Sequence, residues 1–180
     1  GVHSNLTRSD GMPVGAVYGF FNMVLPTLAA ARPNDSFVCV FDASRISFRQ
    51  DIYPEYKANR SETPADLITQ SELIRIGLHA MGVPVLCIPG VEADDVIATI
   101  ATQNCTKSNS TRIITSDKDL MQLVSDCVFL YDGMKEKEIR EPQVLEKFAV
   151  KPNQLIDVQS LMGDPSDNVP GVPGIGPKKA

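Results

Sequence analysis

Short apolar runs rich in β-branched residues alternate with helical segments along nearly the whole chain, and this alternation limits the fold more than any other feature. Strands are predicted at residues 36–41, 83–88, 111–115, 126–131 and 138–140, and helices at residues 14–31, 64–81, 91–102, 117–124, 142–149 and 152–162. Strands separated by helices are typical of domains in which right-handed crossovers join parallel strands. The sequence therefore predicts an α/β domain with a mostly parallel central sheet.

Length and composition indicate one globular domain. The chain has 180 residues, 43% of them hydrophobic, and no apolar run approaches the roughly 20 residues that a membrane span needs. The chain begins at Gly1 without Met, and its first nine residues lack the apolar core of a signal peptide, so we expect a fragment of a longer protein. The net charge of −5 argues against a general polyanion binder.

The cysteines do not form a metal-binding pattern. Cys39, Cys87, Cys105 and Cys127 are far apart in the sequence and include no CxxC pair. Buried, reduced thiols are the usual state of such residues in apolar runs, and they suit a reducing cytosol. We therefore expect no zinc site, and a cytoplasmic location.

Acidic residues follow three of the predicted strands, and a further pair lies late in the chain. They are Asp42; Glu92, Asp94 and Asp95; Asp117 and Asp119; and Asp164 with Asp167. Ligands of open α/β sheets bind outside the carboxyl ends of the strands, so these acids are expected at one edge. Each group alone has an ordinary explanation, because acids in the first turn of a helix complement the helix dipole or cap its end.

The acids together predict a metal site. Clustered carboxylates repel one another unless a positive charge lies among them. Ligands that are all oxygen, without suitable His or Cys, favour Mg²⁺ or Mn²⁺ over zinc. These acids are more than one Mg²⁺ ion needs, and two ions about 4 Å apart would suit the cleavage of phosphodiester bonds. An aspartyl phosphatase with Asp42 as its nucleophile is a weaker alternative.

A polar segment at residues 42–63 lacks stable periodicity and carries Arg45, Arg49, Lys57 and Arg60. Long connections in compact domains are usually functional or mobile. A solvated surface loop with chance basic residues is the alternative explanation for this segment.

The motifs together resemble the 5′ nuclease domain of bacterial DNA polymerase I, within the flap endonuclease family, whose core is PIN-like and three-layered. The motifs that carry the resemblance are SDGMPVGAVYGF, VFDASRISFRQDIYPEYKANR, PGVEADDVIATIA, ITSDKDLMQLV and LMGDPSDNVPGVPGIGPKKA. The resemblance implies that all eight acids named above belong to the metal site, all but Asp167 being also catalytic. It implies that residues 44–63 form a helical arch or clamp for a 5′ single strand, with Lys57 and Arg60 as phosphate contacts and Arg45 and Arg49 as further DNA-binding residues.

The end of the chain resembles the start of a helix–hairpin–helix-like element that grips duplex DNA. Glycines at Gly174 and Gly176 would let backbone N–H groups approach a phosphate, and Lys178 and Lys179 add positive charge. Such contacts select DNA structure and not base order. The resemblance implies an exonuclease core at residues 1–160, without the family's first strand and its aspartate, and a truncated DNA-binding element at 161–180.

The expected function is therefore that of a structure-selective 5′→3′ exonuclease and flap endonuclease that uses two metal ions. Its expected substrates are DNA 5′ ends, flaps or nicks, including RNA primers, and it would act near the bacterial nucleoid, with a polymerase domain in the same parent chain. A non-catalytic module that binds branched DNA, and a stand-alone flap endonuclease, remain as alternatives.

Overall fold

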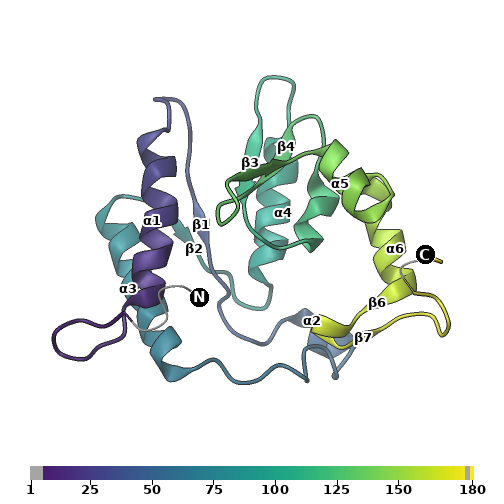
Figure 1. Cartoon of the computed structure of the whole chain (residues 1–180), viewed down its shortest axis with the longest axis horizontal. Coiled ribbons are helices and arrows are strands. Elements are labelled where there is room, and N and C mark those ends of the chain that lie inside the picture. The colour runs from purple at the N-terminus through teal and green to yellow at the C-terminus, as the bar shows by residue number, and fades with distance from the viewer. Residues whose placement is uncertain (1–5, 177–178) are drawn as a thin grey trace. The chain divides into compact units, whose positions relative to one another are not determined.

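The computed structural model describes residues 6–176 and 179–180. Helices and strands alternate along the chain as the sequence predicts (Figure 1). The chain divides into two compact units: unit 1 consists of Gly1–Phe41 with Ser61–Cys87, and unit 2 of Asp42–Arg60 with Ile88–Ala180. Across the described residues, no helix is both long and apolar enough to cross a membrane.

Unit 1 contains two helices and one pair of parallel strands. The helices are α1 (Gly15–Ala29) and α3 (Ala65–Ala80), and β1 (Cys39–Val40) pairs in parallel with β2 (Val85–Leu86). Ile74, Leu78 and Val83 are buried in its core, and Phe20 and Phe21 of α1 pack against them. The predicted strands at 36–41 and 83–88 are longer than the observed ones. Pro84 has no N–H to donate, so it joins the pairing only through its carbonyl, which accepts a hydrogen bond from the Cys39 N–H.

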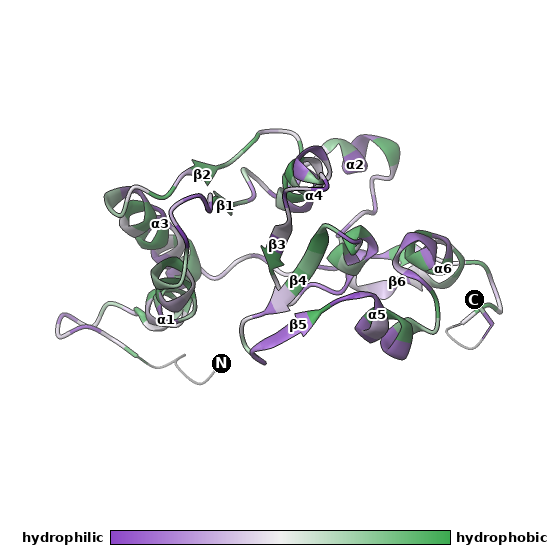
Figure 2. Cartoon of the chain, turned by 90° about the horizontal axis from the view of Figure 1, so that it is seen from above, coloured by the Kyte–Doolittle hydropathy of each residue, from purple (hydrophilic) through white to green (hydrophobic). Residues whose placement is uncertain are grey.

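Unit 2 is built on a three-stranded sheet in the order β3–β4–β5. Strand β3 (Thr111–Ile114) is parallel to β4 (Val128–Asp132), which pairs in antiparallel fashion with β5 (Lys137–Ile139). Strand β4 lies between β3 and β5 in the sheet, and β5 is the more polar of these two neighbours (Figure 2). Its Leu130 is completely buried in a core with Val144 and Leu155. The parallel pairs that the sequence predicts thus form in two sheets, one in each unit.

Unit 2 also contains helices and 3₁₀ turns, some of which contact this sheet. They comprise α2 (Phe48–Ile52), α4 (Ala93–Asn104), α5 (Glu141–Phe148) and α6 (Leu155–Met162), and the 3₁₀ turns η1 (Asp119–Leu123), η2 (Pro152–Gln154) and η3 (Pro165–Asp167). An antiparallel pair, β6 (Gly163–Asp164) with β7 (Val169–Pro170), encloses η3.

The expectation of reduced cysteines is wrong for one pair. Cys105 and Cys127 form a disulfide, with Cα atoms 5.4 Å apart across a separation of 22 residues. Cys105 ends α4, while Cys127 precedes β4 and accepts a hydrogen bond from the Thr111 N–H through its carbonyl. Pairing of β3 with β4 therefore brings together two cysteines that no short sequence motif connects. Neither Cys39 nor Cys87 is disulfide-bonded, as expected.

Gly163 allows the tight β6–β7 hairpin that carries Asp164 and Asp167. Its φ of +73° is in the region that glycine favours, and a Cβ atom there would lie 2.3 Å from the Gly171 nitrogen. Backbone atoms cannot yield as a flexible side chain can. The position therefore requires glycine for both conformational and steric reasons.

We predict that Gly163→Ala destabilises the protein by about 2 kcal/mol or more, since it combines an unfavourable φ with a backbone clash. Urea denaturation would measure the change in the free energy of unfolding. Gly11→Ala is the matched control, because Gly11 also has a positive φ, +86°, but has no atom within 4 Å of its Cβ position. Equal losses in the two variants would show that the close backbone approach at Gly163 has no energetic consequence.

Candidate functional site

Every acid that the sequence predicts for the site lies in unit 2. Asp42 follows β1, Glu92 immediately precedes α4, and Asp94 and Asp95 lie in the first turn of α4. Asp117 and Asp119 follow β3, and the hairpin after α6 carries Asp164 and Asp167. The carboxyl ends of strands thus supply the first three groups, as expected.

The acids differ in how their charge is neutralised. Glu92, Asp95 and Asp167 form salt bridges with basic residues of segment 42–60. In contrast, Asp94, Asp117, Asp119 and Asp164 form no salt bridge with any described residue. Asp42 accepts a hydrogen bond from the Ala93 N–H at 2.7 Å, which ties it to the start of α4. We call Glu92, Asp95 and Asp167 the salt-bridged acids.

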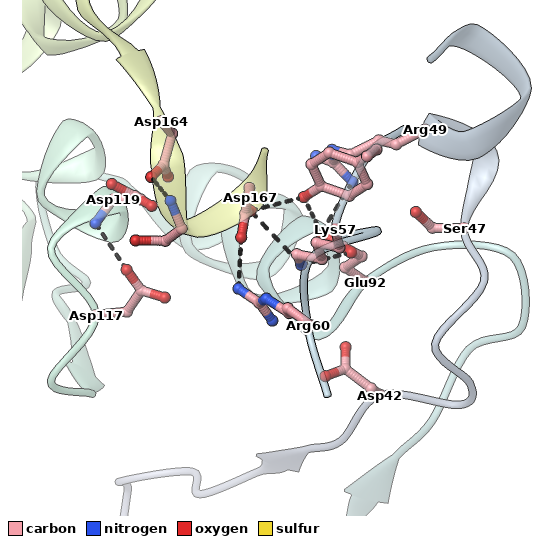
Figure 3. Close-up of polar contacts among 12 residues, drawn as sticks. Asp42, Ser47, Arg49, Lys57, Arg60, Glu92, Asp117, Asp119, Asp164 and Asp167 are labelled. Carbon is pink, nitrogen blue, oxygen red and sulfur yellow. Dashed lines mark hydrogen bonds and ion pairs between the residues drawn. The ribbon is translucent and has the colours of Figure 1, made fainter. Parts of the chain in front are cut away.

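Two basic residues of the YKANR motif bind two of the salt-bridged acids (Figure 3). The Lys57 Nζ lies 2.7 Å from Glu92 Oε1 and 3.7 Å from Asp167 Oδ2, and Arg60 forms an ion pair with Asp167. The Tyr56 hydroxyl lies 2.9 Å from Glu92 Oε2 and 3.0 Å from Asp167 Oδ2. Burial, reinforced by these two carboxylates, raises the pKa of Tyr56. The phenol therefore stays protonated and acts as a hydrogen-bond donor.

Backbone contacts hold the same segment against the β6–β7 hairpin. The Lys57 N–H donates to the Asp167 carbonyl at 2.8 Å, and the Asn168 side chain donates to the Glu55 carbonyl at 2.7 Å. Lys57 has a φ of +57°, which costs a non-glycine residue on the order of 1 kcal/mol. The hydrogen bonds and ion pairs of Lys57 offset that strain and fix its side chain beside Glu92.

The acids without a salt bridge influence one another electrostatically. Burial, followed by the charges of Asp117 and Asp42, raises the pKa of Asp94 to about 6. Burial and the charges of Asp117 and Asp164 likewise raise the pKa of Asp119. Asp94 therefore lies within range of the charges of Asp117 and Asp42, and Asp119 within range of those of Asp117 and Asp164.

Hydrogen bonds orient three of these carboxylates. Asp117 Oδ1 accepts from the Asp119 N–H at 2.8 Å, and Asp164 Oδ1 accepts from the Ser166 N–H at 2.9 Å. Asp119 accepts a hydrogen bond from the Gln159 side-chain amide of α6. Each carboxylate keeps oxygen lone pairs for a further partner.

The donor set fits a hard divalent cation, although the acids do not converge on one point. All the candidate ligand atoms are carboxylate oxygens, which Mg²⁺ and Mn²⁺ prefer, and burial together with the charges of neighbouring acids raises the pKa of Asp94. Within the described ranges, no three Asp, Glu, His or Cys side chains are close enough to hold one ion together. Mutual repulsion of carboxylates opposes closer approach unless a cation joins them.

The basic residues predicted to contact DNA have different surroundings. Arg49 binds Asp95 through two hydrogen bonds of 2.7 Å, and Arg45 donates to the Arg60 carbonyl at 3.1 Å. In the C-terminal turn, Lys179 Nζ donates to the Gly174 carbonyl at 3.2 Å. A Cβ atom at Gly174 or Gly176 would meet nothing within 4 Å, so their backbone is accessible. The predicted contact Lys178 lies outside the described residues.

Tyr56 and Gln159 are site residues that the sequence did not predict. Tyr56 lies between the predicted arch residues in the motif that carried the resemblance, so its position was a usable signal. Gln159 lies on α6 and donates a hydrogen bond to Asp119, which is 40 residues earlier in the sequence. No local sequence pattern indicates such a long-range contact.

Comparison with known proteins gives two family matches that together cover the chain. The family model described as "5'-3' exonuclease, N-terminal resolvase-like domain" matches residues 1–149. The model described as "5'-3' exonuclease, C-terminal SAM fold" matches residues 150–180.

Curated relatives include polymerases and an exonuclease. The chain is 50% identical over 182 residues to "DNA polymerase I" of Rhizobium leguminosarum, covering 97% of this chain and 18% of that protein. It is 41% identical over 175 residues to "5'-3' exonuclease" of Aquifex aeolicus, covering 97% of this chain and 60% of that protein. The chain thus spans only part of the length of these relatives.

Solved structures with the same fold include nucleases crystallised with metal ions or DNA. The T5 D15 protein co-crystallised with metal ions is 27% identical, with a TM-score of 0.74 over 91% of this chain and 64% of that chain. The catalytic core of Rad2 in complex with a DNA substrate is 20% identical, with a TM-score of 0.61 over 98% of this chain and 54% of that chain. The latter match supports the PIN-like fold alone.

We predict that Tyr56→Phe lowers the free energy of unfolding by about 1–3 kcal/mol, because it removes a hydrogen bond from a phenol to charged acceptors. Chemical denaturation would measure the change. Tyr53→Phe is the matched control, since the half-buried Tyr53 has no side-chain hydrogen bond among the described contacts. If both variants lose the same stability, the Tyr56 hydroxyl does not anchor the segment.

Proposed function

Since the chain belongs to the 5′-3′ exonuclease family, we propose that it is the nuclease domain of a longer protein that hydrolyses phosphodiester bonds at DNA 5′ ends, nicks and flaps. Asp42, Asp94 and Asp117 come from three separate stretches of the chain, and burial with the charges of Asp117 and Asp42 raises the pKa of Asp94; this grouping of acids is the observation that carries the proposal. A bound cation stabilises carboxylates grouped in this way.

Two divalent ions, Mg²⁺ or Mn²⁺, suit these ligands best. Asp42 and Asp94 would hold one ion, and Asp117, Asp119 and Asp164 the other, with Glu92 near both. When bound, such ions lower the pKa of a coordinated water and stabilise the charge on the phosphate and on the departing oxygen. Gln159 fixes the orientation of Asp119, and the Asp119 N–H fixes that of Asp117.

Lys57 and Arg60 provide the positive charge for the substrate. Both side chains now neutralise Glu92 and Asp167, and a phosphate would offer them an equivalent anionic partner. Their exchange from carboxylate to phosphate would leave Glu92 and Asp167 available to a metal ion. Substrate and metal binding would then support each other at this end of the segment.

The wider assignments follow from the relatives. We propose a parent chain with a polymerase domain, in the bacterial cytoplasm near DNA, and RNA primers among the substrates. The Aquifex relative is called an exonuclease, so a stand-alone nuclease is the alternative. We also propose that the core extends to about residue 160, with an arch at about 44–63, and that the DNA-gripping element follows residue 160. The first family model ends at residue 149 and the second begins at residue 150.

The test of function is cleavage of a labelled 5′-flap DNA by the complete protein. We expect Mg²⁺-dependent release of the flap, abolished by chelation, with Asp117→Asn and Asp119→Asn each lowering turnover at least about 100-fold while flap binding persists. Asp126→Asn is the control, because Asp126 is an exposed acid just beyond η1. Flap binding without cleavage in the wild type would favour the non-catalytic DNA-binding module.

A second prediction concerns the basic end of the segment. Lys57→Ala should weaken flap binding and reduce the slope of log K against log salt by up to about 0.9, the value for one phosphate contact. The exposed Lys107 provides the control substitution, Lys107→Ala. An unchanged slope for Lys57→Ala would remove Lys57 from the phosphate contacts.

A further inference from the structure

Arg49 and Asp95 form the most completely satisfied ion pair in the described part of the site. Arg49 lies in α2 and Asp95 in the first turn of α4, 46 residues apart, and both nitrogens of the Arg49 fork donate to the carboxylate at 2.7 Å. Their side chains are only 31% and 28% exposed, which limits screening by water. Paired, parallel hydrogen bonds of this kind are strong and geometrically specific.

Asp95 also has a backbone partner that directs it toward Glu92. Its Oδ2 atom accepts a hydrogen bond from the Glu92 N–H at 2.9 Å. The Asp95 carboxylate therefore forms an ion pair with Arg49 and accepts a hydrogen bond from the Glu92 backbone with one of its remaining lone pairs. A metal ion would have to displace these partners before it could bind Asp95.

Arg49 in turn is held in place by α2 and by Glu92 itself. Its guanidinium lies 4.8 Å from the centre of the Phe48 ring, and its Nη1 atom lies 3.4 Å from Glu92 Oε2. The Phe48 N–H donates to the Gly90 carbonyl at 3.0 Å, which fixes the start of α2 beside the loop before α4. Arg49 thus contacts the Glu92 side chain and also Asp95, the residue that binds the Glu92 backbone.

We propose that Arg49 and Asp95 are a pair of positioning residues that orient Glu92, and that neither is a metal ligand or a phosphate contact. The proposal rests on the proposed nuclease function and revises the roles that the resemblance implied for both residues. Asp95 holds the Glu92 main chain, and Arg49 holds Asp95 and the Glu92 carboxylate. The pair acts on the reaction only through Glu92.

A double-mutant cycle on the complete protein tests whether the two residues act as one unit. Arg49→Ala and Asp95→Asn should each lower kcat on flap DNA about tenfold, a usual effect of losing a partner that orients a ligand, with KM for DNA unchanged. The double variant should be no more than about twofold slower than either single variant, because both remove the same interaction. Multiplied losses, or a raised KM for Arg49→Ala, would overturn the proposal.

Calorimetric titration with Mn²⁺ gives a readout that does not depend on cleavage. Asp95→Asn should bind as many ions as the wild type, whereas the matched neighbour Asp94→Asn should lose one ion or bind it at least about tenfold more weakly. Loss of an ion in Asp95→Asn would show that Asp95 is a ligand. Arg49→Lys, which keeps the charge, should recover part of the turnover, and no recovery would contradict a positioning role.

The controls separate this proposal from the proposed function. If the wild type neither binds Mn²⁺ nor cleaves the flap, the nuclease assignment fails, and the positioning pair fails with it. If the wild type cleaves and Asp94→Asn loses an ion, the function stands, and the Asp95 result alone decides the role of the pair. Circular dichroism of each variant, used to normalise kcat to folded protein, excludes unfolding as the cause of a lower rate.

Discussion

Repulsion among carboxylates is the constraint that the loops of unit 2 must satisfy. The predicted acids come from widely separated parts of the chain, and burial and neighbouring charges raise the pKa of Asp94 and of Asp119. Basic side chains of segment 42–60 neutralise Glu92, Asp95 and Asp167, and this reduces the repulsion among the acids. The position of segment 42–60 therefore depends on its ion pairs with these acids.

The salt-bridged acids also explain how a polar segment without a core of its own stays folded. Residues 42–60 contain one five-residue helix, and Ile46 and Ile52 are 71% and 77% exposed. Hydrophobic burial contributes little to holding such a segment. Its order depends on Arg49, Lys57 and Arg60, each bound to an acid of another element. It also depends on hydrogen bonds that the segment donates to the carbonyls of residues 90, 165 and 167, the one to residue 165 coming from the Asn59 side chain. A segment held mainly by polar contacts can exchange those contacts for the phosphates of a substrate.

Glu92 is the point at which these interactions meet. It precedes α4, its N–H binds Asp95, and its carboxylate contacts Arg49, Tyr56 and Lys57. Its side chain is only 12% exposed, so each contact acts in a poorly solvated environment. A change at any of its partners would therefore affect the orientation of Glu92, the acid that is proposed to lie near both ions.

The sequence by itself determined the α/β class and the approximate position of most helices and strands, and it predicted the candidate acids, because periodicity and strand-end residues are local signals. It did not predict α2 or the β6–β7 hairpin. Only the tertiary structure decided which acids are neutralised by the protein, since the Arg49–Asp95 and Lys57–Glu92 pairs join residues 46 and 35 positions apart. The Cys105–Cys127 pairing likewise depended on the register of β3 and β4. A sequence lists charges in order along the chain, but electrostatic energy depends on distances in space, which the fold alone sets.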